Sequence, residues 1–387
     1  MNAADKGHLT LLGLFDLSAA FDTVDHAILL KSLHLSVGVT GTVLTWFTSY
    51  LGSRTARVSW NGTLSDSITL EHGVPQGSVL GPLLFLVYTI GIDSIFLRHN
   101  FNIHMYADDV QAYVHCMPSE QSSAVLQFQN CAGELLDYMS SRRLRLNPQK
   151  TEFMWLGSPM NLRKVTEHSI DLFGTVLHQS STVRNLGVIF DPSLAFTEHI
   201  SRLSRTCFFQ LRNLRRIRRC ISKSSALQLV HAFVTCHLDY CNSILHGLPA
   251  VQVGRLQAVL NSAARLVSGS HTHHNTAAKL KSLHWLPYPH RVTFKLCLLS
   301  YRCLHSMAPK YLSSFIKPVA EMHSRASLRS SSSGQLLIPR ARTKRFGNRS
   351  FGVSAPTAWN SLPKNLHDSS ISLPGFKGVL KTHLFRA

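Results

Sequence analysis

The segment that most constrains the fold is Tyr106-Ala107-Asp108-Asp109, which lies between two short stretches of alternating apolar and polar residues. Alternation with a period of two is typical of half-buried strands, so residues 102–105 and 110–114 are predicted to form a β-hairpin with both carboxylates at its tip. Adjacent aspartates repel each other and contribute little packing unless a cation neutralises them. Their hard oxygen ligands suit Mg²⁺, although Asp-Asp pairs also occur in ordinary solvated turns.

A third carboxylate favours the metal interpretation. Asp16 ends the apolar run of residues 9–15, which is predicted to be a buried strand, and residues 18–33 are predicted to form a helix after it. An acid at a strand end beside a hairpin with two more acids is how proteins hold two metal ions about 4 Å apart for in-line phosphoryl transfer. We therefore predict that Asp16, Asp108 and Asp109 bind two Mg²⁺ ions, with Mn²⁺ as the alternative metal.

Charge is distributed unevenly along the 387 residues. Residues 1–150 carry 9 Lys or Arg and 12 Asp or Glu, a net charge of −3, whereas residues 151–387 carry 31 and 8, a net charge of +23. The apolar content of 44% is enough for two or three units with their own cores. An acidic half joined to a basic half indicates that the second half contacts a polyanion.

The eight cysteines are scattered without paired short spacings and no signal peptide opens the chain, which is typical of a reducing, intracellular compartment with thiols as small apolar fillers. Cys236 and Cys241, with His231 and His237 nearby, could suggest zinc, but the surrounding apolar residues favour a core helix. The longest apolar stretch, residues 79–92, is too short to span a bilayer, so we expect a buried helix and no membrane contact.

Three residues near the acids are candidates for handling a nucleotide. Phe21 follows Asp16 by five positions, where its ring could exclude a 2′-hydroxyl, although it could equally pack in the core. Gln76 lies on a Gly/Pro loop and offers an amide to a sugar or phosphate. Such a loop could equally serve only to end one element before the next helix, which Ser78 could cap. Lys150, at the start of another predicted strand, could protonate a leaving pyrophosphate or simply be solvated.

Other polar residues in this half receive more ordinary interpretations. Asp22 and Asp25 are expected to cap the helix that follows rather than to bind metal. Arg54 and Arg57 follow the aromatic segment 46–51 and suit contacts to a template strand, although a helix end with solvated charges would look the same.

Before residue 193, residues 121–145 are predicted to form a helix and residues 184–190 half of a hairpin. Beyond residue 193 the pattern is helical, with helices predicted over residues 194–221, 224–238, 251–268 and 291–305. The helix over 194–221 carries arginines on all faces, too many to pair with the acids present, and phosphates would neutralise them best. These residues are Arg202, Arg205, Arg212, Arg215, Arg216, Arg218 and Arg219. Residues 320–351 are rich in Ser and Arg and are expected to be a flexible contact surface.

Five segments carry a resemblance to a known family. FDLSAAFDTVDH, GVPQGSVLGPLLF, YADD, LNPQKTEF and RNLGVIFD occur in the order and spacing of reverse transcriptases, and the chain resembles the polymerase of non-LTR retrotransposons, the long interspersed elements. The later segments HLDYCNSIL, LHWLP and APTAWNSLP resemble the C-terminal regions of the same elements. The resemblance therefore extends over nearly the whole chain.

The resemblance implies a role for each matching residue. The catalytic acids that bind metal would be Asp16, Asp108 and Asp109, with Lys150 as general acid. The pocket of the incoming nucleotide would be lined by Phe21, Gln76, Tyr106 and Ala107. The loop that grips the primer would be Leu186, Gly187 and Val188. The implied reaction is attack of a primer 3′-hydroxyl on a deoxynucleoside triphosphate (dNTP), templated by RNA and assisted by two Mg²⁺ ions.

The expected fold class is α+β. A reverse-transcriptase palm of antiparallel sheet backed by helices is expected over residues 1–192, a helical thumb-like region over residues 193–270, and a basic, helical and partly flexible C-terminal region over residues 271–387. Because only 15 residues precede Asp16, the fingers that come before the palm in these polymerases are expected to be largely missing.

Two functions stay open on the sequence alone. One is an RNA-directed DNA polymerase domain whose partners are an RNA template, a DNA primer or target, and dNTP. The other is a non-catalytic nucleic-acid-binding remnant of a truncated element. The resemblance favours the polymerase and implies action in the nucleus, with the cytoplasm as the alternative.

Overall fold

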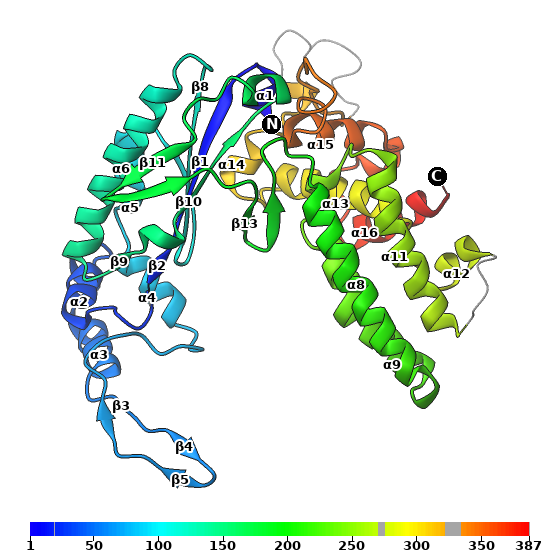
Figure 1. The fold of residues 1–387 in the computed structure, drawn as a ribbon. Helices are drawn as coiled ribbons and strands as arrows, with labels where there is room; N and C mark the ends of the chain where they lie inside the picture. The colour runs from blue at the N-terminus through cyan, green and yellow to red at the C-terminus, as the bar shows by residue number, and fades with distance from the viewer. Residues whose placement is uncertain (19, 270–274, 322–333, 387) are drawn as a thin grey trace. The chain divides into compact units, whose positions relative to one another are not determined.

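The apolar run at the start of the chain forms β1 (Leu9–Phe15), which lies inside a four-stranded antiparallel sheet of order β10-β1-β8-β7 (Figure 1). β7 (Asn102–Tyr106) and β8 (Asp109–Cys116) form the predicted hairpin, and β10 (Glu152–Leu156) pairs with the other edge of β1. β1 is buried almost throughout, because it has a strand on each side and apolar side chains on both faces.

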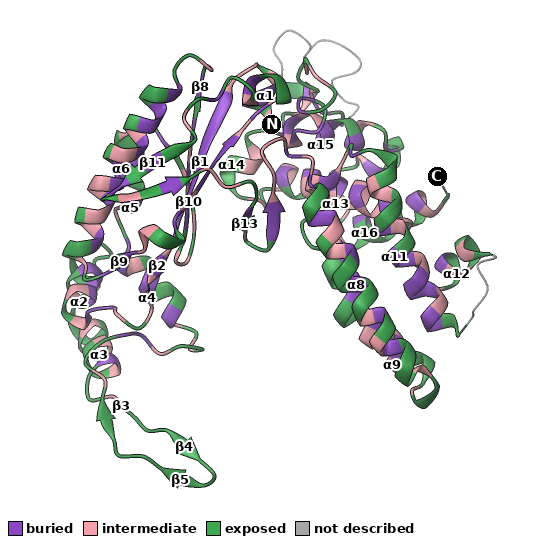
Figure 2. Cartoon of the chain, viewed as in Figure 1, coloured by how far each residue is buried: buried purple, intermediate pink, exposed green. Residues whose placement is uncertain are grey.

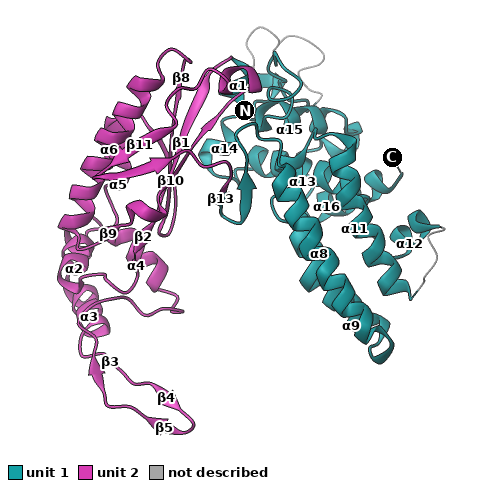
Figure 3. Ribbon diagram, in the orientation of Figure 1, with its two compact units in different colours: residues 1–6, 184–387 teal, residues 7–183 magenta. Residues whose placement is uncertain are grey.

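The structure is a computed structural model that describes residues 1–18, 20–269, 275–321 and 334–386. It divides into residues 7–183, here called the sheet unit, and residues 1–6 with 184–387, here called the helical unit (Figure 3). The sheet unit holds 10 Lys or Arg and 14 Asp or Glu, a net charge of −4, and the helical unit holds 30 and 6, a net charge of +24. The division into palm, thumb-like and C-terminal regions stays a prediction.

Helices and short strands surround the sheet in the sheet unit. The helices are α2 (His26–Leu35), α3 (Gly41–Leu51), α4 (Gly81–Tyr88), α5 (Ile92–Arg98), α6 (Gln121–Ser141), η1 (Pro148–Lys150) and α7 (Pro159–Leu162). The paired short strands are β2 (Leu17–Ser18) with β9 (Arg145–Leu146), β3 (Thr55–Ala56) with β6 (Ile68–Thr69), β4 (Ser59–Trp60) with β5 (Thr63–Leu64), and β11 (Ser169–Leu172) with β12 (Thr175–His178).

The core of this unit lies between the sheet and its helices. α6 turns an apolar stripe inward, which appears as the buried side of that helix in Figure 2. Phe128 of this stripe is 1% exposed and stacks on Phe15 of β1, with ring centroids 5.3 Å apart. The contact lies next to Gly13, where the absence of a side chain lets the ring approach the strand.

The helix predicted over residues 18–33 begins later than expected. Asp25 accepts a hydrogen bond from the backbone N–H of Ile28 at 2.9 Å, and α2 starts at His26. The segment before it is held in an irregular conformation by the loop after residue 72, because Gly73 N–H donates to Val24 O and Val74 N–H donates to Phe21 O. The prediction that Asp25 caps the helix is therefore confirmed, but the predicted start of the helix is wrong.

The apolar stretch over residues 79–92 is not one buried helix. α4 ends at Tyr88, α5 begins at Ile92, and Leu83 and Leu86 of α4 are 55% and 46% exposed, because only one face of this short helix packs on the core. The expectation of burial on all sides is therefore wrong. In the part of the chain that the structure describes, no single helix is long and apolar enough to cross a membrane. Among these residues only α4 and α5, which meet at a bend of 42°, have the required length and hydropathy when taken together.

The helical unit contains most of the helices that the sequence predicts. Its strands are β13 (Val183–Asn185) and β14 (Val188–Phe190), and the first residue of β13 belongs to the sheet unit. Its longer helices are α8 (Thr197–Ile217), α9 (Lys223–Val230), α11 (Ala250–Ser268), α12 (Thr276–Ser282), α13 (Tyr288–Leu304), α15 (Phe351–Asn360) and α16 (Leu373–Arg386). Its shorter segments are α1 (Asn2–Asp5), η2 (Arg218–Cys220), the π-helical η3 (His231–Thr235), α10 (Cys236–Asp239), η4 (Asn242–Leu245), α14 (Lys310–Ser313), η5 (Val319–Glu321) and η7 (Lys364–Leu366).

The Ser/Arg-rich stretch over residues 320–351 is only partly described, because residues 322–333 lie outside the described residues. Phe346 and Arg349 are buried, at 3% and 6% exposed, and Arg349 Nε donates to the carbonyl oxygen of His246 at 3.1 Å. Asp5 of α1 accepts hydrogen bonds from the backbone N–H and the hydroxyl of Thr343. The expectation of a flexible surface is therefore wrong for residues 343–349, which pack against the rest of the helical unit.

The close approach at Gly13 gives a test of the core. A Cβ added there would overlap Cε2 of Phe128 and lie 2.7 Å from its Cζ. Gly13→Ala is expected to lower the free energy of unfolding by about 1–3 kcal/mol, the usual cost of overpacking. Urea unfolding followed by tryptophan fluorescence measures this. Gly133→Ala is the matched control, since a Cβ on that helical glycine meets nothing within 4 Å and should stabilise by about 0.5–1 kcal/mol. Equal effects of the two changes would contradict the packing described.

Candidate active site

The hairpin of β7 and β8 places two carboxylates at one end of the sheet. Tyr106 pairs with Asp109, so Ala107 and Asp108 form a two-residue turn, and Ala107 has a φ of 55°. A positive φ at the first central residue is the backbone conformation that tight hairpin turns require. The predicted hairpin with the aspartates at its tip is confirmed. Tyr106 is 67% exposed at the end of β7, so its ring is free to contact a ligand.

The third acid reaches the same end of the sheet through strand pairing. Phe15 is the last residue of β1 and pairs with Val110, so Asp16 follows at the position opposite Asp109. Asp109 is exposed as a residue, but the protein around its carboxyl removes part of the hydrating water, and this partial burial raises its pKa. The negative charges of Asp108 and Asp16 raise the pKa further. Asp16 therefore acts electrostatically on the hairpin acids, although 92 residues separate it from Asp108 along the chain.

Lys150 is brought to this group by a short pairing that the sequence does not reveal. β2 follows Asp16 directly and pairs with β9, and the N–H of Asn147 donates to the carbonyl oxygen of Asp16 at 3.0 Å. η1 then places Lys150 Nζ 3.6 Å from Oδ2 of Asp16. The lysine is 66% exposed, so its ammonium group can reach both the acid and the solvent.

The donor set suits a divalent cation. Oδ2 of Asp16 is buried without a hydrogen-bond partner, and the acids raise the pKa of Asp109, so negative charge exceeds what Lys150 alone neutralises. Carboxylate oxygens are the ligands that Mg²⁺ and Mn²⁺ prefer. Within the described residues, no three His, Cys, Asp or Glu side chains are already gathered in the geometry of a metal centre. The metal roles of Asp16, Asp108 and Asp109 therefore stay a prediction that the chemistry of the ligands supports.

The loop that carries Gln76 is tied to the segment that follows Asp16. Nε2 of Gln76 donates to Oδ1 of Asp22 at 2.7 Å, so Asp22 does not cap α2, and that prediction is wrong. Phe21 is half-buried and its ring stacks on Phe85, with centroids 4.7 Å apart. Ser78 accepts a hydrogen bond from the N–H of Gly81 at the start of α4, but the N-cap position of this helix is Leu80 and not Ser78. Phe21 thus combines core packing with an accessible edge.

The predicted primer-gripping loop lies in the helical unit. Leu186 and Gly187 form the turn between β13 and β14, with φ values of 43° and 83°, and the hydroxyl of Tyr240 donates to the carbonyl oxygen of Leu186 at 2.7 Å. Val188 is 4% exposed and packs inward. Residues 184–190 are predicted to be half of a hairpin, but they contain its turn, all of β14 and most of β13, so the hairpin is shorter than predicted. Tyr240, which contacts this loop, is not indicated by the sequence patterns.

The arginines over 202–219 divide into two groups. Six are exposed, and the buried face of α8 is formed by other residues; the six are Arg202, Arg205, Arg212, Arg215, Arg216 and Arg219. Arg205 pairs with Glu198 at 3.2 Å. Arg218 differs, because its guanidinium donates to the carbonyl oxygens of Leu266, Val267 and Ile221 at 2.8–3.1 Å. It joins the end of α8 to the end of α11, so the structure uses it for packing.

The zinc alternative concerned His231, His237, Cys236 and Cys241. Sγ of Cys236 donates to the carbonyl oxygen of Ala232 at 2.7 Å, and Nδ1 of His231 bonds with the hydroxyl of Thr235 at 2.9 Å. The segment is helical, as the sequence predicts, but it contains the π-helical turn η3. All eight cysteines are free thiols, and five of them are buried, which agrees with their predicted role as apolar fillers.

Comparison with known proteins identifies the class. Residues 2–190 match the model of the reverse transcriptase (RNA-dependent DNA polymerase) family. The chain is 27% identical over 241 residues to a probable RNA-directed DNA polymerase from transposon BS of Drosophila melanogaster, which covers 57% of this chain and 25% of that protein. It is 24% identical over 259 residues to the corresponding X-element protein of the same organism, covering 66% and 28%. It is 23% identical over 279 residues to the RNA-directed DNA polymerase from mobile element jockey of Drosophila funebris, covering 70% and 30%.

Solved structures give weaker likenesses. A telomerase from Candida albicans in complex with a fragment of telomeric RNA superposes with a TM-score of 0.38 at 16% identity, over 73% of this chain and 45% of that one. Apo telomerase from Candida tropicalis gives 0.37 at 12% identity, over 77% and 51%.

Residues 2–190 are a reverse transcriptase domain with a mixed fold of helix and sheet. More particularly, this domain is of the type found in non-LTR retrotransposons, the long interspersed elements. It spans about a quarter to a third of the length of the curated relatives that it matches. The matches favour the RNA-directed DNA polymerase domain over the non-catalytic remnant.

The raised pKa of Asp109, caused first by partial burial and then by the charges of Asp108 and Asp16, predicts a stability effect that depends on pH. Its raised pKa means that folding disfavours the ionised carboxylate, so Asp109→Asn should raise the melting temperature at pH 7.5 without divalent metal. The residue is exposed, so solvent screening keeps the gain small, about 1–2 °C. The gain should vanish as the pH falls below the ordinary carboxyl range, because the wild-type carboxyl is then protonated in both states. Scanning calorimetry measures this, with the exposed Asp137→Asn on α6 as control; a loss of stability in Asp109→Asn at pH 7.5 would contradict the raised pKa.

Proposed function

We propose that the sheet unit catalyses RNA-templated DNA synthesis, with Asp16, Asp108 and Asp109 as ligands of two Mg²⁺ ions, or of Mn²⁺ in its place. The observation that carries this proposal is the register of β1 and β8, which ends with Asp16 opposite Asp109 and beside the turn that holds Asp108. Bound divalent cations would neutralise the triphosphate and favour ionisation of the attacking 3′-hydroxyl. The match of residues 2–190 to the reverse transcriptase family supports the assignment.

The chain's own residues supply the other parts of the reaction. Lys150, whose Nζ is 3.6 Å from Asp16, is placed to give a proton to the departing pyrophosphate. The amide of Gln76, oriented by Asp22, offers a hydrogen bond to the sugar or phosphate of the dNTP. Tyr106 and Ala107 line the binding site of the dNTP, Tyr106 with its side chain and Ala107 with its backbone. Phe21, fixed against Phe85, bounds the sugar and excludes a 2′-hydroxyl.

The rest of the chain holds the nucleic acid. Residues 1–192 act as the palm, residues 193–270 as a thumb-like region and residues 271–387 as a basic C-terminal region. The turn of Leu186, Gly187 and Val188 grips the primer strand, and the exposed arginines of α8 and η2 contact phosphates of the RNA template or of the DNA primer or target. A net charge of +24 on the helical unit supports this role. The reaction takes place inside the cell, in the nucleus.

Catalysis is tested by primer extension. The purified chain, alone and joined to a reverse-transcriptase fingers segment, is given Mg²⁺, dNTP and a DNA primer annealed to RNA. Extension is expected in at least one form, and Asp108→Ala should lower its rate by about 10³-fold or more, because metal binding contributes several kcal/mol to transition-state stabilisation. Asp137→Ala, which removes a carboxylate from the surface of α6, is the control and should leave the rate unchanged. No extension in either form, or equal rates for Asp108→Ala and wild type, would refute the polymerase assignment.

The sugar-selecting role of Phe21 is tested separately. Phe21→Val shortens the side chain and should lower the preference for dNTP over ribonucleoside triphosphate by about tenfold or more, while dNTP use continues. Single-nucleotide extension with each substrate gives the ratio of kcat/KM values. A purely packing role predicts the opposite pattern: a lower melting temperature from the lost contact with Phe85, with the substrate ratio unchanged.

A further inference from the structure

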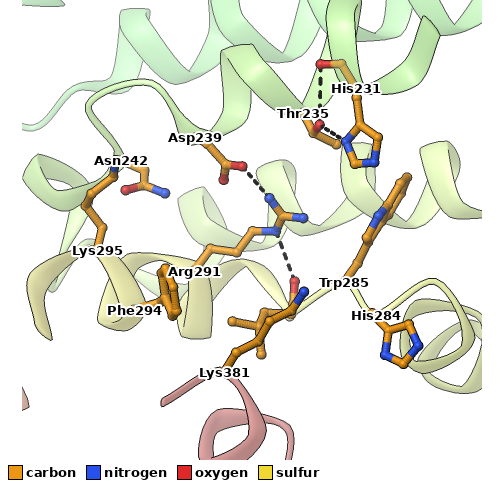
Figure 4. A pocket seen from close by; sticks show the side chains of 11 residues that line it. His231, Thr235, Asp239, Asn242, His284, Trp285, Arg291, Phe294, Lys295 and Lys381 are labelled. Carbon is orange, nitrogen blue, oxygen red and sulfur yellow. Dashed lines mark hydrogen bonds and ion pairs between the residues drawn. The ribbon is translucent and has the colours of Figure 1, made fainter. Parts of the chain in front are cut away.

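The helical unit contains a pocket that the proposed polymerase reaction does not use. Its cavity is about 320 Å³ and lies among η3, α10 and η4 on one side, and the loop before α13, α13 itself and α16 on the other (Figure 4). This volume is at the lower end of the roughly 300–1,000 Å³ typical of sites for small molecules. Trp285, in the segment LHWLP, is one of its lining residues.

One charged pair in this pocket has a structural role. Arg291 donates to Oδ2 of Asp239 at 2.5 Å and to the carbonyl oxygen of Leu286 at 3.1 Å, and only 12% of its side chain is exposed. The two opposite charges cancel. Figure 4 shows this pair in the middle of the pocket, where it fixes α13 against α10.

Two lysines leave the pocket with excess positive charge. Lys295 of α13 and Lys381 of α16 both line the cavity, and no ion pair or hydrogen bond holds the ammonium group of either within the residues that the structure describes. The charge of Lys381 reaches across the cavity, since burial and then Arg291 and Lys381 lower the pKa of His231. Two cations that face one cavity without an acid to pair with them are best satisfied by an anionic ligand.

A buried amide adds a second, independent requirement. Asn242 lines the pocket, is 2% exposed, and its Oδ1 has no hydrogen-bond partner among the described residues. An unsatisfied buried acceptor costs about 1–3 kcal/mol, and a ligand in the cavity that reaches this amide with a hydrogen-bond donor would recover that cost. A bare phosphate ion would balance the charge of the two lysines, but it has no planar ring to contact the aromatic side chains of the cavity.

Aromatic side chains also line the cavity. Trp285, which is 4% exposed, meets the ring of the exposed His231 edge to face, with centroids 5.5 Å apart and an interplanar angle of 67°. Phe294 of α13 lines the cavity on the other side of Arg291 (Figure 4). Because the pKa of His231 is lowered, its imidazole is neutral near pH 7 and behaves as an aromatic surface. Exposed aromatic rings of this kind bind nucleobases in single strands, at about 1–3 kcal/mol for each stacked base.

We propose that this pocket binds one nucleotide of single-stranded RNA, with its phosphate between Lys295 and Lys381, a hydroxyl or amine donating to Asn242, and its base against the exposed ring of His231, which Trp285 supports. A nucleotide is the ligand class that combines an anion, a donor and a planar ring. The proposal deepens the proposed function, on which it rests for the choice of RNA, by giving the template strand a fixed holding site outside the sheet unit.

The test is RNA binding by the full chain without metal or dNTP. Fluorescence anisotropy with an unstructured, 5′-labelled 12-nucleotide RNA at 0.15 M salt, conditions of our choosing at roughly physiological ionic strength, gives the Kd. The double variant Lys295→Gln/Lys381→Gln is expected to raise the Kd about tenfold. The matched control Lys364→Gln/Lys377→Gln removes the same charge from η7 and from the same helix α16, outside the pocket, and should change the Kd less than about threefold. Equal changes in the two double variants would overturn the proposal, because general charge would then explain binding.

Two further measurements locate the ligand. RNA that carries 4-thiouridine, irradiated on the wild-type chain, should form adducts on the peptide that contains Trp285, and adducts confined to other peptides would overturn the site. Asn242→Leu should weaken RNA binding while leaving the melting temperature unchanged or higher, because it removes an unsatisfied buried polar atom. A lower melting temperature with normal binding would assign Asn242 to packing and remove it from the site. Equal Kd values for RNA and for DNA of the same sequence would overturn the choice of RNA.

These measurements separate the pocket from the polymerase. Asp108→Ala should keep the Trp285 adduct although it slows extension by about 10³-fold or more. If the wild-type chain forms the adduct but does not extend the primer, only the polymerase assignment is refuted. Extension in the wild type without the adduct would refute only the pocket.

Discussion

The pairing of β1 with β8 is the constraint on which the candidate active site depends. Side chains alternate across a strand, so a slip of one residue would move Asp16 away from Asp109 and turn Phe15 to the opposite face of the sheet, away from Phe128. The aromatic packing of Phe15 on Phe128 and on Phe96 prevents that slip, because it fixes the residue just before Asp16 in the core. The hydrophobic core therefore sets the position of the carboxylates, although it contains none of them.

The same arrangement places charge where the fold alone would not favour it. Three acids converge on one end of the sheet, and Lys150 provides a single compensating cation at 3.6 Å from Asp16. Concentrated like charge lowers stability, and proteins commonly accept such a cost at sites that bind a counter-ion. The lysine arrives through the two-residue pairing of β2 with β9, so the cation and the first acid are positioned by one local structure.

The sequence predicts those features that follow a period, and it misses those that depend on single contacts between distant segments. The hairpin around Asp108 and the helices of the second half are readable because apolar residues recur every two or every 3.6 positions. The hydrogen bond between Gln76 and Asp22 joins residues that are 54 positions apart, and no local sequence pattern indicates it. Arg218 illustrates the same point, because the sequence around it does not distinguish it from Arg219. In the described residues only Arg218 of the two donates hydrogen bonds to three carbonyl oxygens near helix ends. The start of α2 was likewise set by the loop at Gly73, which lies far along the chain.

The charges of the helical unit can be divided by what surrounds them. Only 6 acids accompany its 30 Lys and Arg, so most of its cations have no carboxylate to pair with. The exposed arginines of α8 lie on a convex helix surface, where they can meet phosphates of any sequence and where salt screens them strongly. Lys295 and Lys381 instead line a cavity that also contains a buried unsatisfied amide and aromatic side chains. A surface of the first kind holds a strand by charge alone, whereas a cavity of the second kind can fix the position of one nucleotide within that strand.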